Sequence, residues 1–128
     1  MTVEQTVLPA WKMAIKNRTP QSGLIFHSDR GVQYASHAFR EVLAKEKVRQ
    51  SMSRKANCWD NAVAEAFFKI LKSELGYDTH FSSFQQARIA LFEFIEIWYN
   101  RQRIHGSIGY RTPIQMEQLL LSNLNNAA

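Results

Sequence analysis

Two acidic residues, Asp29 and Glu65, have the type and placement that metal-dependent chemistry uses. Asp29 comes shortly after the apolar run 24–26, and Glu65 falls near the start of a predicted helix, so that 35 residues lie between positions 29 and 65. Carboxylates are the hard oxygen ligands that cations such as Mg²⁺ prefer. Each acid alone also has an ordinary structural explanation, because Asp29 suits a turn near Gly31 and Glu65 suits a helix N-terminus.

The segments around Asp29 predict a strand, helix, strand unit. Helical spacing of apolar residues predicts a first helix over about 3–16, and the run 24–26 predicts a short strand buried on both faces. Ser36 is a predicted N-cap for a helix over 37–45, and residues 48–52 predict a second strand. Asp29 is therefore expected near the C-terminal end of a strand.

The second half of the chain predicts helices. Asp60 is a predicted N-cap for a helix that carries Glu65 and ends at Gly76. A further long helix is predicted from about Ser83 to Tyr99, and a last helix begins at Pro113, where proline suits the first turn. These elements predict an α/β chain that is mostly helical with two short strands.

Aromatic residues at helical spacing are predicted to form the core. Trp59, Trp98 and the phenylalanines are assigned there, because large aromatics are the usual means of burying a helix face. The single cysteine, Cys58, excludes an internal disulfide and a cysteine-based zinc cage within one chain. We interpret Cys58 as a small packed side chain.

Composition favours a polyanionic partner. The 128 residues carry 16 Lys+Arg against 11 Asp+Glu, a net charge of +5 and a pI near 9.6. Residues 39–72 hold eight of the basic residues and four of the acidic ones, so nucleic acid is the expected partner. Without an apolar run of about 18 residues or a signal peptide, we expect a cytoplasmic protein with no membrane partner. No linker or repeat divides residues 1–128, so a single domain is predicted.

Five ordered segments carry a resemblance to a known family. They read HSDRGVQY, SMSRK, NCWDNAVAEAFF, YNRQRIH and GYRTP, at 27–34, 51–55, 57–68, 99–105 and 109–113. Together they resemble the C-terminal part of the catalytic core of insertion-sequence transposases of the IS3 type, which are similar to retroviral integrases. Several motifs in order are much more specific than one short pattern.

The resemblance implies a partial ribonuclease-H-like fold, the integrase core, in which a mixed sheet is flanked by helices. The family's catalytic set is Asp, Asp and Glu, known as DDE, with about 35 residues between the last two members. By this resemblance Asp29 is the second aspartate and Glu65 is the glutamate. Both are expected to hold Mg²⁺ or Mn²⁺ during DNA cleavage and strand transfer.

Other residues are candidates for supporting or DNA-binding roles. His27 shares a strand face with Asp29 if the strand continues, and a metal-ligand or proton-shuttle role is one interpretation. For Lys69 and Lys72, the alternative is that both are simple solvated side chains. For the polar and aromatic residues over 99–105, the alternative is a structural network. The predicted DNA-binding residues are Arg54, Lys55, Lys69 and Lys72, and the predicted supporting residues are His27, Asn61, Asn100, Arg103 and His105.

The chain departs from the family pattern in three ways. No counterpart of the first catalytic aspartate is present, since Glu4 is the only acid before Asp29, and the first three strands are expected to be absent with it. Val32 stands where a small polar residue is expected and Ala56 where glycine is expected.

Because the first aspartate and the first three strands are missing, we expect the chain to be inactive alone and to self-associate as a homo-oligomer. A DNA-binding or oligomerisation module without catalysis, and a structural remnant with neither property, are the alternatives.

Overall fold

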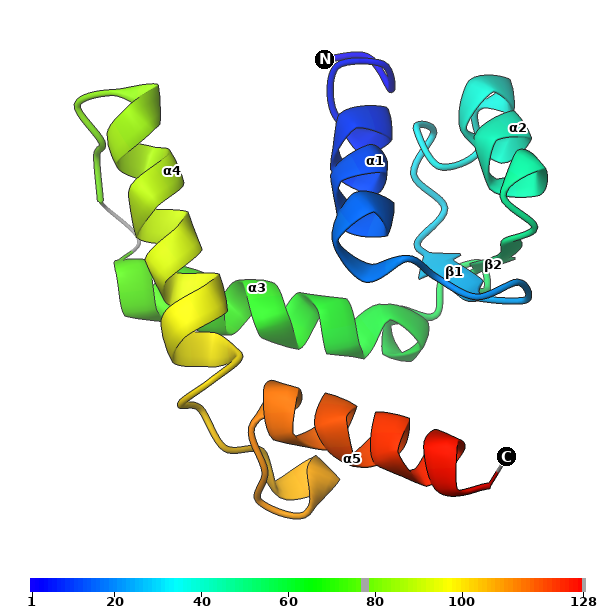
Figure 1. Ribbon diagram of the computed structural model, residues 1–128. Helices are drawn as coiled ribbons and strands as arrows, with labels where there is room; N and C mark the ends of the chain where they lie inside the picture. Colours follow the sequence, from blue (N-terminus) through cyan, green and yellow to red (C-terminus); the bar gives the residue numbers. More distant parts are fainter. Residues whose placement is uncertain (77–78, 128) are drawn as a thin grey trace. The chain divides into compact units, whose positions relative to one another are not determined.

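The computed structural model describes residues 1–76 and 79–127, and the chain divides into two units, Met1–Lys69 and Ile70–Ala128 (Figure 1). That residues 1–128 form a single domain stays a prediction. Within the described residues, no helix combines the length and the apolar character needed to cross a membrane.

The first unit contains the predicted strand, helix, strand unit. Strand β1 (Ile25–Ser28) and strand β2 (Arg49–Met52) are parallel, with Ile25 paired to Arg49, and helix α2 (His37–Lys45) connects them (Figure 1). Helix α1 (Val7–Arg18) precedes the sheet. The predicted N-cap is confirmed, because the Ser36 side chain accepts a hydrogen bond from Phe39 N.

The core of this unit combines aromatic and aliphatic side chains and lies on one face of the small sheet. Phe39 of α2 is fully buried, and its ring centroid lies 5.1 Å from that of Phe26 and 6.4 Å from that of Trp11. Successive residues of a strand point to opposite faces, and Ile25, next to Phe26, is 54% exposed. The prediction of a strand buried on both faces is wrong, because the described residues cover only the face that carries Phe26.

The connection to Glu65 differs from the prediction. After a turn in which Ala56 has φ +56°, a short 3₁₀ helix η1 (Cys58–Asn61) leads into α3 (Ala62–Leu75). Asp60 is not the N-cap, because its carboxylate binds Arg54 instead. The left-handed backbone at Ala56 favours glycine, which agrees with the glycine expected from the family pattern.

The predicted burial of Cys58 and Trp59 is wrong. Cys58 is exposed, Trp59 is 82% exposed, and Phe68, Phe84 and Phe92 are 53%, 85% and 59% exposed. Helical spacing identifies the side chains that share a helix face, but it does not establish that another element covers that face. Trp98 is half-buried and packs on Phe94, with 5.3 Å between ring centroids.

The second unit contains the predicted later helices. Helix α4 (Phe84–Phe92) begins after Ser83, whose side chain accepts from Gln86 N, and it continues as a π-helix, η2 (Glu93–Tyr99). Helix α5 (Pro113–Asn126) has proline in its first turn, as predicted, and its N-cap forms a capping box. The π-helical geometry of η2 was not predicted.

The 99–105 segment forms a contact network within the second unit. The Tyr99 and His105 rings lie 5.1 Å apart, the Arg103 guanidinium lies 5.7 Å from the Tyr99 centroid, and Arg103 Nη1 is 2.7 Å from His105 Nδ1. Burial, and then the Arg103 charge, lower the pKa of His105. Asn100 O accepts from Ile114 N at 3.0 Å, which joins this segment to α5. These contacts agree with the structural alternative, and a DNA-contacting role for these residues stays a prediction.

Candidate active site around Asp29 and Glu65

Asp29 lies immediately after β1, and a tight turn fixes its carboxylate. Gly31 N donates to Asp29 Oδ1 at 2.8 Å. A Cβ atom at position 31 would lie 2.9 Å from that same oxygen, so glycine is what permits the close approach. The strand end and the turn together hold one carboxylate oxygen in place, and Oδ2 accepts no hydrogen bond from residues that the structure describes.

The fold brings Asp29 and Glu65 to the same cavity. A hollow of about 320 Å³ is lined by both acids and by Asn61, together with aromatic side chains that include Phe26 and Tyr34. A second hollow of about 410 Å³ is also lined by Asp29, Glu65 and Asn61. Its other lining residues are Arg30, Ser53, Arg54, Ala56, Asn57 and Cys58. The two acids and Asn61 therefore border both an aromatic hollow and a hollow that also carries Arg30 and Arg54.

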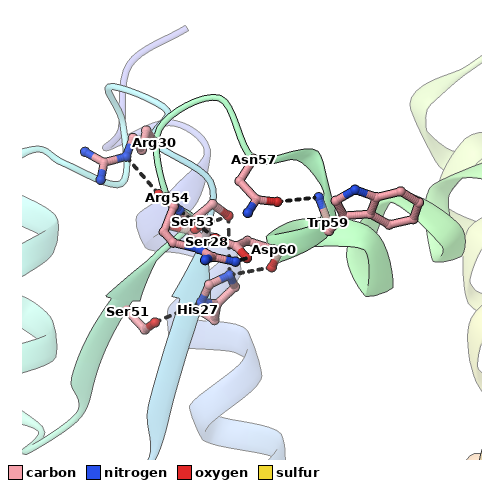
Figure 2. A network of polar contacts seen from close by, with 9 residues as sticks. All are labelled: His27, Ser28, Arg30, Ser51, Ser53, Arg54, Asn57, Trp59 and Asp60. Atoms are coloured by element: carbon pink, nitrogen blue, oxygen red, sulfur yellow. Dashed lines mark hydrogen bonds and ion pairs between the residues drawn. The ribbon is translucent and has the colours of Figure 1, made fainter.

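His27 holds the segment that precedes α3. Its Nδ1 lies 2.9 Å from Ser51 Oγ on β2, and its Nε2 lies 2.8 Å from the Asp60 carbonyl oxygen (Figure 2). A carbonyl only accepts, so Nε2 donates to Asp60 O, while Nδ1 is paired with the serine hydroxyl, which can donate or accept. Because both ring nitrogens are engaged, the geometry supports a positioning role for His27 and not a metal-ligand role.

Arg54 and Asp60 form a bidentate ion pair that joins the two ends of the loop before α3. The Arg54 side chain donates to Asp60 through Nε at 2.9 Å and through Nη2 at 2.9 Å, and its backbone N donates to Oδ2 at 2.7 Å. These hydrogen bonds hold the pKa of Asp60 well below its usual range and raise the pKa of Arg54. Asp60 is thus committed to Arg54, and much of the Arg54 charge is compensated within the loop.

The predicted lysines lie on exposed surface. Lys69 and Lys72 follow Glu65 on α3 by four and seven residues, a spacing that places all three on one face of the helix, and both lysines are exposed. Lys55 is exposed in the loop before η1. Among the described residues, no ion pair involves Lys55, Lys69 or Lys72.

Three contributors to the site were not predicted. Arg30 Nε donates to the Ser53 carbonyl at 2.8 Å, and Asn57 Oδ1 accepts from Trp59 N at 3.1 Å (Figure 2). Ser51 supplies the hydroxyl that fixes the His27 ring. The position of Asn57 just before a short helix was the available signal, since asparagine is among the preferred N-cap residues.

The chain matches known proteins along most of its length. Two family models, both described as integrase core domain, match residues 46–113 and residues 1–58. The transposase for insertion sequence element IS904 from Lactococcus lactis is 38% identical over 115 residues, which are 90% of this chain and 46% of the relative. The transposase InsF for insertion sequence IS3A from Escherichia coli is 40% identical over 113 residues, or 88% of this chain and 39% of the relative.

The solved structures agree on the fold. A chain in the structure of a simian T-cell lymphotropic virus intasome complex matches with a TM-score of 0.68 and 18% identity, over 91% of this chain and 40% of that chain. This confirms the predicted partial ribonuclease-H-like fold. The chain spans less than half the length of the curated relatives named here. The resemblance to IS3-type transposases is confirmed, and the chain belongs to the integrase core domain family.

Proposed function

We propose that this chain supplies part of a catalytic core for DNA transposition, in which divalent-metal-dependent strand cleavage is followed by strand transfer. The observation that carries the proposal is that Asp29 and Glu65, far apart in sequence, line the same cavity. The family membership gives these two positions their proposed roles as the second aspartate and the glutamate of the catalytic set.

The donor set fits Mg²⁺ or Mn²⁺. Asp29 and Glu65 offer hard carboxylate oxygens, and no group of three or more His, Cys, Asp or Glu residues gathers within the described part of the chain. Mg²⁺ is commonly held by one or two carboxylates together with water and substrate phosphates, so two acids suit an ion shared with DNA. When bound, such ions stabilise the charge on the attacking and leaving oxygens of phosphodiester displacement.

The protein's own residues would position the reacting strand. Asp29 is fixed by the Gly31 turn, and Glu65 is carried on a regular helix. Asn61 borders both hollows, and its side-chain amide is suited to donate to a phosphate oxygen. His27 acts as a positioning residue, because it ties the segment before α3 to β2.

Exposed lysines beside the acids would bind the DNA backbone. Lys69 and Lys72 share the Glu65 face of α3, and Lys55 adds charge from the preceding loop. Such contacts fix position on DNA without reading its sequence. The DNA cleavage and strand transfer would take place in the bacterial cytoplasm. Self-association is part of the proposal, since the exposed Leu24, just before β1, and Ile25, at its start, leave apolar surface to be covered.

The salt dependence of DNA binding tests this assignment. A Lys69→Ala, Lys72→Ala double variant should bind every duplex sequence more weakly, and its log Kd against log salt plot should flatten by roughly 0.9 for each phosphate that is no longer neutralised. The measurement is fluorescence anisotropy with a labelled duplex across a salt series. Sequence preference should not change, because phosphate contacts carry no base information.

A matched control separates local binding from total charge. Lys12 and Lys16 are also exposed and four residues apart, on α1. A Lys12→Ala, Lys16→Ala variant has the same reduction in net charge and should keep the parental slope. Equal slopes for the parent and the Lys69, Lys72 variant would place the DNA path elsewhere.

A further inference from the structure

Trp59 is a large aromatic side chain held out into solvent beside the candidate active site. It is 82% exposed, although tryptophan is usually well buried. Figure 2 shows its indole directed away from the polar network drawn with it. Among the described residues, the indole makes no aromatic or cation–π contact, so it takes no part in the core around Phe39. The exposed indole is therefore available to contact a partner.

The backbone on both sides of Trp59 is restrained. Asn57 Oδ1 accepts from Trp59 N at 3.1 Å, and the next residue, Asp60, is held by Arg54 through its carboxylate and by His27 through its carbonyl oxygen. An indole on a restrained backbone gives up little conformational freedom when it binds, so more of the interaction energy appears as affinity. Two residues further, Asn61 borders both hollows that Asp29 and Glu65 line.

The charge around Trp59 indicates the kind of partner. Lys55 lies in the same exposed loop and Arg30 lines the adjacent hollow, while the charge of Arg54 is largely compensated by Asp60. Exposed cations beside an exposed aromatic ring are a combination that binds single-stranded nucleic acid, since the cations meet phosphates and the ring stacks on a base. The base faces of a duplex are covered by stacking on their neighbours. The ligand that fits the exposed indole is therefore an unpaired base.

We propose that Trp59 stacks on an unpaired base of the DNA strand that enters the active site, next to the phosphate held between Asp29 and Glu65. This assignment rests on the proposed function and adds a strand-positioning residue to it. The ring would fix the base while Lys55 and Asn61 meet the backbone on either side. Because every base has a π face, this stacking tolerates any sequence.

Two oligomers of equal charge test the stacking interaction. The probes are oligothymidylate of about 12 nucleotides and a tetrahydrofuran abasic oligomer of the same length, within the usual range of single-strand sites. Trp59→Ala should weaken binding of the 128-residue chain to oligothymidylate by about 5- to 150-fold, the range for one stacked base, and leave abasic binding unchanged. Trp59→Phe should be intermediate. Phe84→Ala, which removes an aromatic that is 85% exposed elsewhere in the chain, should change neither affinity.

The outcomes separate this inference from the proposed function. Equal affinities of the parent and the Trp59→Ala variant for oligothymidylate would overturn the stacking role while leaving backbone binding in place. A parent chain that binds neither oligomer nor a duplex would contradict the proposed function itself and the inference with it. Dissociation of a dimer by Trp59→Ala, with unchanged DNA affinity in sedimentation and anisotropy measurements, would assign the indole to a second copy and overturn the inference.

Discussion

Glu65→Gln and Asp29→Asn are each expected to lower the rate of strand transfer by about 1,000-fold or more, in a version of the protein that carries the first catalytic aspartate of the family. Both changes keep the side-chain shape and remove a negative charge. Metal-ion stabilisation of the transition state is worth several kcal/mol, and each 1.36 kcal/mol corresponds to a factor of about ten in rate. The measurement is the yield of joined product from labelled transposon ends against time.

DNA binding and a neighbouring acid supply the controls. Removal of a carboxylate charge beside the DNA path should leave duplex affinity unchanged or slightly higher, because a repulsive charge disappears. Glu74→Gln removes an exposed acid from the same helix and should keep parental activity. Full strand transfer by the Glu65→Gln protein would end the assignment of this residue to the catalytic set.

Phe39→Ala should have the largest effect on stability, about 3–5 kcal/mol of unfolding free energy, as for other buried phenylalanines. Phe39 is fully buried at the centre of an aromatic cluster, and its ring centroid lies 5.1 Å from that of Phe26 and 6.1 Å from that of Tyr34. Removing the ring leaves a cavity behind β1, the strand that places Asp29. Urea unfolding followed by far-UV circular dichroism measures the decrease.

The matched control for this substitution is Phe84→Ala. Phe84 is 85% exposed, and surface substitutions usually change stability by less than about 0.5 kcal/mol. A similar, small effect of both substitutions would contradict the assignment of Phe39 to the core. A large effect of Phe39→Ala alone would link the packing of α2 to the strand that carries the candidate ligand.

Elements that begin with local chemistry could be predicted from the sequence. Ser36 caps α2 and Ser83 caps α4 through side-chain oxygens that accept backbone N–H groups within three residues. Pro113 likewise suits the first turn of α5, where a missing N–H costs nothing. These choices depend on a few neighbouring residues, so the rest of the fold does not change them.

Features that depend on distant residues could not be predicted in the same way. Aspartate is a common N-cap residue, but the Asp60 carboxylate forms a bidentate ion pair with Arg54, which is stronger than a hydrogen bond to a backbone N–H of the helix. Ile25 and Trp59 are apolar, and whether an apolar side chain is buried depends on what covers it. Local patterns identify which residues prefer burial, and only the assembled fold decides which of them obtain it.

The residues of the candidate site came from the family resemblance, and their catalytic role stays a prediction, while the surroundings of the site were not predicted. The family resemblance selected Asp29 and Glu65, and the fold places both on the same cavity. The sequence did not predict that Asn61 borders two hollows, or that both His27 nitrogens are engaged in holding the loop. Those features depend on residues of β1, β2 and the segment leading into α3, which are distant in sequence. A short sequence pattern therefore does not predict them.

Mn²⁺ titration of the 128-residue chain, followed by electron paramagnetic resonance, tests most directly whether Asp29 and Glu65 hold a divalent cation together. Asp29→Asn and Glu65→Gln should each weaken Mn²⁺ binding by about tenfold or more, since removal of a residue that merely supports a ligand typically costs 10- to 100-fold. Glu74→Gln should bind as the parent does. Equal Mn²⁺ affinity in the parent and all three variants would contradict a shared metal site and favour a DNA-binding module without catalysis.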